Sequence, residues 1–206
     1  MMKDNKPDHY FSAKTQAPSG PRQIGATVRG LKLRLWTDHG VFSYGKLDRG
    51  SKILAEAMQL PEHGEVLDWG AGYGVLGIVA ALLCPQCRVT LVEVNERAAA
   101  LAQQNIEVAG AGNATVLTGP APEVLDDRQF DAIISNPPLH VGRSAVDTII
   151  REASQRLRPG GSLWLVVPTK KGARGFLSLM TELFAQAETV DVTGGFRVLM
   201  ARQRRD

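Results

Sequence analysis

The chain carries a glycine-rich turn of the kind that approaches a bound cofactor. The stretch VLDWGAGYGVLG places a carboxylate, Asp68, just before three glycines at alternate positions, Gly70, Gly72 and Gly74. Glycine lets the backbone pass close to a ligand and adopt positive φ angles that cost other residues energy. Because ligands of open parallel sheets bind outside the carboxyl ends of strands, this strand-to-helix turn predicts a cofactor site.

The acidic residues around this turn limit which cofactors it can bind. GYGVLG at 72–77 matches the G-x-G-x-x-G dinucleotide fingerprint, and Glu93, about 20 residues on, would bind a ribose hydroxyl in several cofactors. Asp68 favours S-adenosylmethionine, because a carboxylate can contact the amino-acid portion of that cofactor but would repel a pyrophosphate. The sequence favours S-adenosylmethionine, with a nicotinamide-dependent oxidoreductase as an alternative that rests on GYGVLG alone.

A second candidate site lies in FDAIISNPPLH, where an apolar run stops at Asn136 and continues into Pro137 and Pro138. One interpretation is that two prolines simply terminate a strand, because they donate no N–H to a sheet. The other is that the turn forms a rigid pair of acceptors, the Asn136 amide oxygen and the Pro137 carbonyl, with no local donor to satisfy them. Such a pair suits a substrate –NH2 group and would favour the charge that develops on methylation.

The elements that must position these residues alternate along the chain. Hydrophobic patterns predict strands at 65–69, 88–94, 114–118, 130–135, 161–167, 187–192 and 196–202, and helices at 51–60, 75–84, 96–109, 144–157 and 172–186. Short apolar strands alternating with helices are typical of a mostly parallel sheet covered on both faces. We expect a flexible basic lead-in at 1–23, a hairpin and loop at 24–50 with TDHG as the hairpin turn, and one main domain at 51–206.

Charge is uneven along the chain. Residues 1–52 hold ten Lys and Arg against four Asp, a net +6, so the remainder carries −3 of the total +3. A basic segment on a mildly acidic body predicts a polyanionic partner or, equally, a solvated tail. No apolar run is long enough to span a bilayer and the N-terminus lacks the apolar core of a signal peptide, so a soluble cytoplasmic protein is expected.

The two cysteines lie in CPQC at 84–87. They are too few for a disulfide framework and suit a reducing compartment. The pair follows a predicted helix, whereas a redox pair sits at a helix N-terminus, and no second cysteine pair accompanies it. Neither a redox centre nor a metal site is predicted.

Together the motifs resemble a known family. D-x-G-x-G-x-G at 68–74, the acid at 93 followed by Val-Asn, and N-P-P at 136–138 are similar to class I S-adenosylmethionine-dependent amino-methyltransferases. GVFSYGKLDRGSKIL, NPPLHVG and GGSLWLVVPTKKGA resemble the small-methyltransferase-domain family, typified by the guanine N2-specific ribosomal RNA small-subunit methyltransferase C. The resemblance covers about residues 40–202, and the lead-in DHYFSAKTQ is similar to that of single-domain bacterial members.

The resemblance implies a Rossmann-like α/β fold with a seven-stranded, mostly parallel sheet, an antiparallel last strand and helices on both faces. It implies methyl transfer from S-adenosylmethionine to an exocyclic amine, foremost N2 of a guanine in ribosomal RNA. The implied cofactor residues are Asp68, Gly70, Gly72, Gly74, Glu93 and Asn95, the implied amine-binding residues Asn136 and Pro137, and the implied substrate-binding residues Pro138, Leu139 and His140.

Two departures from the family pattern keep alternatives open. Many relatives have Phe where this chain has Leu139, and the third strand is followed by LTGPAPEV, which offers no acid at 119–121 for the adenine. A non-catalytic RNA-binding relative therefore remains an alternative. Methylation of protein glutamine or DNA adenine is another, although Tyr usually follows the prolines in those enzymes. Lys170, Lys171 and Arg174 are additional candidates for RNA contact.

Overall fold

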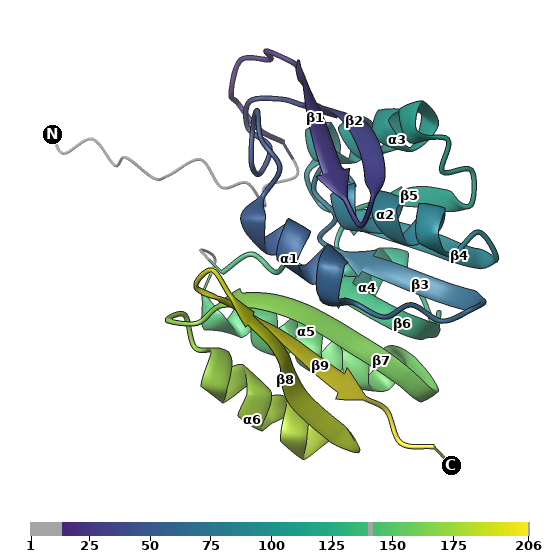
Figure 1. Ribbon diagram of the computed structural model, residues 1–206, viewed down its shortest axis with the longest axis vertical. Helices are drawn as coiled ribbons and strands as arrows, with labels where there is room; N and C mark the ends of the chain where they lie inside the picture. The colour runs from purple at the N-terminus through teal and green to yellow at the C-terminus, as the bar shows by residue number, and fades with distance from the viewer. Residues whose placement is uncertain (1–13, 140–141, 206) are drawn as a thin grey trace, which may run out of the picture.

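A seven-stranded sheet forms the centre of the molecule in the computed structural model, which describes residues 14–139 and 142–205 (Figure 1). Its spatial order is β5-β4-β3-β6-β7-β9-β8. The strands are β3 (Gly64–Trp69), β4 (Cys87–Glu93), β5 (Ala114–Thr118), β6 (Phe130–Ser135), β7 (Leu157–Pro168), β8 (Gln186–Thr193) and β9 (Phe196–Arg202). β9 runs antiparallel to both of its neighbours, β7 and β8, and the other strand pairs of this sheet are parallel. The predicted sheet, with an antiparallel last strand, is confirmed.

Helices cover both faces of the sheet (Figure 1). One face carries α1 (Arg49–Ala57), α2 (Val75–Leu83), α3 (Glu96–Ala109) and a separate hairpin of β1 (Arg22–Val28) and β2 (Leu31–Thr37). The other carries α4 (Ala121–Val124), α5 (Arg143–Arg156) and α6 (Ala173–Leu183). Each face has its own apolar core because the central strands are buried on both sides, as the near-continuous apolar runs predict.

The turn of the β1–β2 hairpin differs from the predicted one. It consists of Arg29 and Gly30, both with positive φ (48° and 79°), whereas TDHG begins at Thr37, the last residue of the second strand. Two consecutive positive φ angles match the right-handed twist of paired strands, so this short turn is favoured in hairpins. The prediction from TDHG was wrong because its composition is turn-like, while Arg-Gly gives a weaker signal.

The lead-in is anchored in part where the sequence predicted flexibility up to residue 23. Ser19 Oγ and the Gly20 N–H donate to the two carboxylate oxygens of Asp38, each at 2.6 Å, and β1 already begins at Arg22. Asp38 is buried, so these bonds stabilise a carboxylate that water does not reach. The predictions for residues 1–13 lie outside the described residues.

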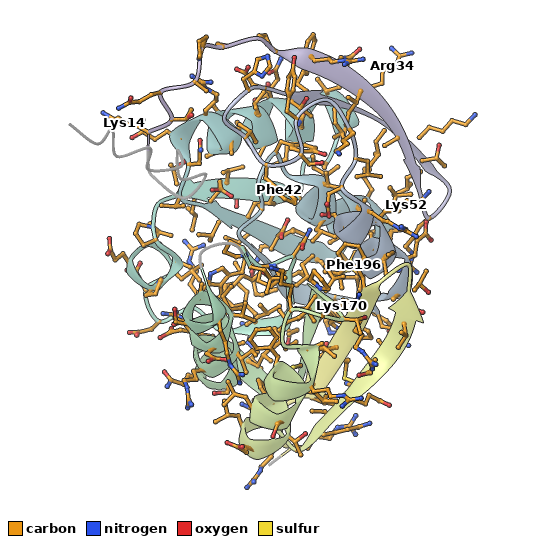
Figure 2. All side chains as sticks on the ribbon, turned by 90° about the vertical axis from the view of Figure 1, so that its left-hand side faces the viewer. Lys14, Arg34, Phe42, Lys52, Lys170 and Phe196 are labelled. Carbon is orange, nitrogen blue, oxygen red and sulfur yellow. A yellow bond between two sulfur atoms is a disulfide. The ribbon has the colours of Figure 1, made fainter. Side chains whose placement is uncertain are left out.

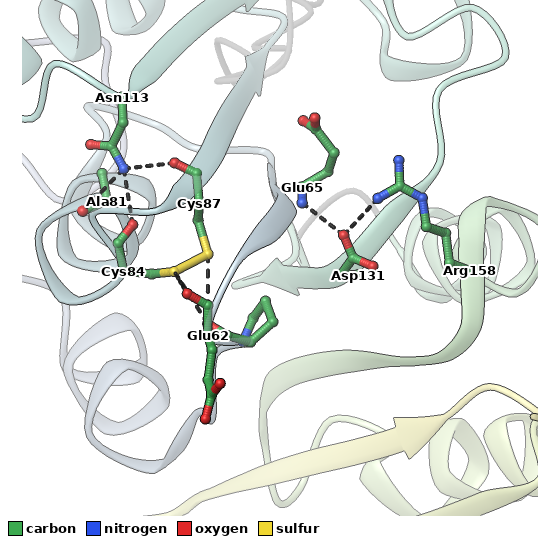
Figure 3. The surroundings of a disulfide bond; sticks show 9 residues. Glu62, Glu65, Ala81, Cys84, Cys87, Asn113, Asp131 and Arg158 are labelled. Carbon is green, nitrogen blue, oxygen red and sulfur yellow. Dashed lines mark hydrogen bonds and ion pairs between the residues drawn. A yellow bond between two sulfur atoms is a disulfide. The ribbon is translucent and has the colours of Figure 1, made fainter.

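The cysteines also differ from expectation, because Cys84 and Cys87 form a disulfide at the C-terminus of α2 (Figure 3). Asn113 Nδ2 donates to the carbonyls of Ala81, Cys84 and Cys87 and so fixes the turn between them. This end of the sheet is where β3 and β4 begin, opposite the ends that the glycine turn follows. In the part of the chain described, no helix is long and apolar enough to cross a membrane.

Candidate functional site

The strand order reverses beside β3: the chain leaves β3 toward β4 and β5, then returns to form β6 on its other side. Such a switch point opens a crevice at the carboxyl ends of the strands. Here a cavity of about 360 Å³ lies at those ends and is lined by both predicted clusters, including Gly70, Gly72, Glu93 and Asn136. Ser135 Oγ donates to the Trp69 carbonyl at 2.7 Å and ties the ends of β6 and β3 together.

The glycine turn presents bare backbone to this cavity. Gly70 and Gly72 have φ angles of 75° and 57°. A Cβ atom added at either position would meet no atom within 4 Å, so both face open space. The N–H groups of Gly70 and Ala71 donate to the Val92 carbonyl, which holds the turn against β4. The turn is thus a rigid surface that a ligand can approach closely.

Glu93 lies at the end of β4 and is 5% exposed. Its Oε2 accepts the Gly72 N–H at 2.7 Å and its Oε1 accepts the Asn95 N–H at 2.8 Å. Burial raises the pKa of Glu93, and these backbone donors oppose that rise. Each oxygen keeps a lone pair for a further donor such as a ribose hydroxyl. Asn95 also lines the cavity, but its Oδ1 caps α3 by accepting from Arg97 and Ala98.

Asp68 and Gly74 lie outside the lining of the cavity. Asp68 is 1% exposed, and its Oδ2 accepts the Gly77 N–H at 2.7 Å, so it binds the first turn of α2. Its Oδ1 is buried with no hydrogen-bond partner within the described residues. Burial, and then the nearby Glu93, raise the pKa of Asp68 to about 7. Gly74 begins α2, where an added Cβ would lie 3.2 Å from Ala102 Cβ, so this glycine permits close helix packing.

The side chain of Asn136 has a fixed orientation. Its Nδ2 donates to Asp48 Oδ2 at 2.8 Å and to Ser51 Oγ at 2.9 Å. A carboxylate oxygen only accepts, so the amide nitrogen must face Asp48 and the amide oxygen must face away from it. Both N–H bonds are used inside the protein, which leaves Oδ1 as the available acceptor.

The rest of the N-P-P turn is more constrained than the sequence suggested. The Leu139 N–H donates to the Pro137 carbonyl at 2.9 Å, so the expectation that no local donor satisfies this carbonyl was wrong. A carbonyl oxygen has two lone pairs, and one remains for a substrate. Pro137, Pro138 and Leu139 all line the cavity. His140 lies outside the described residues.

Several lining residues were not identified as site residues from the sequence: Val41, Phe42, Asp48, Ser51, Tyr73, Pro168 and Phe196. Figure 2 looks onto this edge of the sheet and shows Phe42, Phe196 and Lys170 near the middle of the face. The stretch GVFSYGKLDRGS contains most of the missed residues. Its Asp-x-x-Ser pattern marks the helix start at Asp48, where the Asp48 side chain accepts the Ser51 N–H.

The sheet order and the position of this cavity define a Rossmann-like methyltransferase fold. The chain belongs to the methyltransferase small domain family, whose model matches residues 32–200. The predicted family and fold class are therefore confirmed. Membership of a methyltransferase family also removes the support for the nicotinamide alternative.

Relatives of three kinds are similar to the chain. The uncharacterized protein YbxB of Bacillus subtilis is 30% identical over 95% of this chain and 98% of its own length. Ribosomal RNA small subunit methyltransferase C of Pseudomonas aeruginosa is 34% identical over 91% of this chain and 58% of its length. The structure of the 16S rRNA N2 methyltransferase of T. thermophilus, in complex with AdoMet and guanosine, matches with a TM-score of 0.74, 31% identity, and coverage of 91% of this chain and 52% of that chain. The chain thus spans about half the length of these ribosomal RNA methyltransferases.

Proposed function

We propose that this chain transfers a methyl group from S-adenosylmethionine to the exocyclic N2 amine of a guanine in ribosomal RNA. The observation that carries this proposal is the Asn136 amide, held with its oxygen as the available acceptor in the same cavity as the glycine turn. The ribosomal RNA methyltransferases among the relatives support the substrate.

The cofactor is S-adenosylmethionine, because the family consists of methyltransferases and the T. thermophilus relative was solved with AdoMet. The site fits this ligand: Gly70 and Gly72 leave open space, and Glu93 retains acceptor capacity for ribose hydroxyls. Asp68 Oδ1 is buried without a partner in the described chain and lies behind the lining of the cavity, so we assign Asp68 the support of the turn through the Gly77 N–H and no direct contact with the cofactor. When bound, the cofactor supplies an electrophilic methyl group on a sulfonium.

The residues of the N-P-P turn hold the nucleophile. An exocyclic amine on a base is a weak nucleophile because its lone pair is delocalised into the ring. Asn136 Oδ1 and the free lone pair of the Pro137 carbonyl accept its two hydrogens and direct the nitrogen toward the glycine turn. As the N–CH3 bond would form and the S–CH3 bond would break, positive charge develops on the nitrogen, and these preorganised acceptors stabilise it more than they stabilise the neutral amine. The methylated nitrogen then loses one proton to solvent.

Phe196 supplies an aromatic wall that the turn itself lacks. Leu139 packs against a base face but forgoes aromatic stacking, which is worth about 1–3 kcal/mol per base. Phe196 lines the cavity from the start of β9, and a Cβ added at Gly50 would lie 3.2 Å from its ring and 3.5 Å from Asn136 Nδ2. The ring is therefore close to the amide that grips the amine, and we assign the base to the space beside it.

Exposed cations lie on the elements that border the cavity, Lys171 lines it, and such cations suit the phosphates of an RNA. They lie on the loop before α1, on α1 itself, on the loop between β7 and α6, and in the first turn of α6: Lys46, Arg49, Lys52, Lys170, Lys171 and Arg174. None of them takes part in an ion pair among the described residues. Such cations contribute affinity through counterion release without reading sequence.

The test is methyl transfer to small ribosomal subunits, and to their extracted RNA, from cells that lack this gene. We expect N2-methylguanine by mass spectrometry, with a rate that falls roughly 10²-fold in Asn136→Ala, the scale of losing one preorganised contact. Gln103→Ala, an exposed amide on α3 outside the cavity, is the matched control and should keep the wild-type rate.

Each alternative has its own signature in this experiment. A methylated protein or DNA adenine in place of guanine would replace the substrate assignment. RNA binding without methyl transfer, in a protein that binds S-adenosylhomocysteine, would indicate a non-catalytic relative. A near-native rate in a folded Asn136→Ala variant would refute the mechanism.

A further inference from the structure

We propose that Asp48 is the positioning residue of the amine site: it fixes the Asn136 amide and strengthens its oxygen as an acceptor. This inference rests on the proposed function, since it concerns how Asn136 performs its role. The two residues are 88 positions apart in the chain, and the fold brings Asp48 Oδ2 within 2.8 Å of Asn136 Nδ2.

The contact goes beyond what a helix cap needs. Asp48 Oδ2 accepts the Ser51 N–H at 2.7 Å, which alone would satisfy the start of α1. The same oxygen also accepts from Asn136, and Ser51 Oγ accepts the second amide hydrogen at 2.9 Å. A Cβ added at Gly50 would lie 3.0 Å from Asp48 Oδ2 and 3.5 Å from Asn136 Nδ2. The first turn of α1 is therefore packed directly onto the amide, and glycine permits this approach.

Two consequences follow for the chemistry. Because both amide hydrogens are bound at the start of α1, the side-chain amide cannot flip by 180°. Oδ1 therefore keeps the orientation that accepts a substrate amine. A carboxylate that accepts an amide N–H also polarises the amide and makes its oxygen a stronger acceptor. Asp48 itself lines the cavity. Burial is the largest cause that raises the pKa of Tyr73 above its ordinary value, and the negative charge of Asp48 is the second. The electric field of Asp48 therefore reaches the neighbouring cavity wall.

Two substitutions separate charge, position and helix capping. Asp48→Asn can keep both hydrogen bonds through its Oδ1 but removes the charge. Asp48→Ser still caps α1, since serine is a good N-cap, but is too short to reach Asn136. In single-turnover reactions at saturating cofactor and RNA, we expect a fall of about 10-fold for Asp48→Asn and about 10²-fold for Asp48→Ser. Affinity for S-adenosylhomocysteine and the melting temperature should stay close to wild type.

A double-mutant cycle gives the readout that a merely structural role would not produce. If Asp48 acts through Asn136, Asp48→Ser combined with Asn136→Ala should be no more than about 3-fold slower than Asn136→Ala alone. Multiplying effects, near 10⁴-fold in the double variant, would overturn the inference. So would an Asp48→Ser variant with the wild-type rate.

Nuclear magnetic resonance tests the positioning without any reaction. The side-chain amide pair of Asn136 is identified by its disappearance in Asn136→Ala, and we expect its two proton shifts to move in Asp48→Ser. Unmoved shifts would overturn the inference whatever the activity. If the shifts move in Asp48→Ser but the wild-type protein methylates no RNA, the proposed function is refuted while the positioning contact stands. The two failures are therefore distinguishable.

Discussion

Asp68 and Glu93 are two carboxylates buried beside one glycine turn, at 1% and 5% exposure. Burying a carboxylate without a cation costs stability unless backbone donors compensate. Backbone donors reach both oxygens of Glu93 but only Oδ2 of Asp68, which leaves Asp68 Oδ1 unsatisfied among the described residues. The folded protein therefore keeps Asp68 at an energetic cost.

This cost predicts that Asp68→Asn increases the stability of the fold by an amount that depends on pH. The folded-state pKa of Asp68 is about 7 against an ordinary 3.8, so between these values the folded chain holds a proton that the unfolded chain has lost. Stability consequently falls as pH rises from about 4 to about 7. In urea unfolding without ligand, Asp68→Asn should gain at least about 1 kcal/mol at pH 8, the equivalent of about one pKa unit. The gain should vanish near pH 4.

Asp127→Asn, at an exposed position, is the control and should show no such pH-dependent gain. A lower stability of Asp68→Asn at pH 8 would show that the buried carboxylate is not the destabilising group described.

Gly72 carries a second prediction at the scale of a single residue. Valine at this position would fill open cavity space and would also be strained at φ 57°. Isothermal titration should show affinity for S-adenosylhomocysteine reduced at least about 10²-fold. Gly112→Ala, where an added Cβ also meets no atom, is outside the cavity and should bind normally. Retained affinity in a folded Gly72→Val protein would exclude the turn as the cofactor site.

Among the elements, the hairpin is held to the domain by its apolar core face, by Arg29, which donates to the Met58 carbonyl, and by a buried amide, Asn105 of α3. Its Oδ1 accepts the Trp36 N–H at 2.6 Å, and its Nδ2 donates to the carbonyls of Trp36 and Tyr73. The hairpin precedes the loop that brings Phe42 and Asp48 to the cavity. Asn105 thus links β2, the glycine turn and α3 at a single point.

Asn105→Ala should therefore destabilise the fold by about 2–4 kcal/mol, because it leaves three backbone groups without their partner in a buried place. Urea unfolding measures the loss, with Gln103→Ala on the exposed side of the same helix as the control. A loss below about 0.5 kcal/mol would mean that water or a backbone shift replaces these bonds.

Local pattern was enough to predict most of the elements. The ranges 96–109, 114–118, 130–135 and 196–202 are predicted to the residue, because periodicity and flanking turn residues mark their limits. β7 begins earlier than predicted, at Leu157, because Pro-Gly-Gly is typical of a turn while the backbone before it is already extended. The short helix α4 gave no periodic signal and was not predicted.

Local sequence patterns could not predict the long-range contacts. Asp48 is recognisable as a helix cap, but its contact with Asn136 depends on how α1 packs against the end of β6. The Cys84–Cys87 disulfide depends on the turn that Asn113 fixes from the far side of β4. Phe196 lines the cavity only because β9 inserts between β7 and β8 and brings its first residue beside Pro168.

At the scale of the whole molecule, exposed cations occur on two opposite ends. One set surrounds the cavity at the carboxyl ends of the strands, and another, with Arg128, Arg204 and Arg205, lies toward the ends where the strands begin. Net charge alone does not distinguish these ends. The proposed function does, because only the first end can deliver a base to Asn136.

The difference between these two ends leads to a prediction about RNA binding. Replacing Lys170, Lys171 and Arg174 with glutamine removes three positive charges from the cavity end, and the same replacement of Arg128, Arg204 and Arg205 removes three from the opposite end. Because both variants have the same net charge, any non-specific effect of charge on RNA binding cancels between them. Each phosphate that a cation neutralises adds about −0.7 to −0.9 to the slope of log affinity against log salt.

We expect the slope to become shallower by about 1–3 in the cavity-end variant, in proportion to the number of phosphates that its three cations neutralise, and to change little in the other. Fluorescence anisotropy with ribosomal RNA fragments at several salt concentrations measures both slopes, and S-adenosylhomocysteine affinity should be unchanged in both proteins. Equal slopes would show that RNA does not approach along the cavity face. A larger change in the opposite-end variant would place the RNA where no base can reach Asn136, and would argue against ribosomal RNA as the substrate.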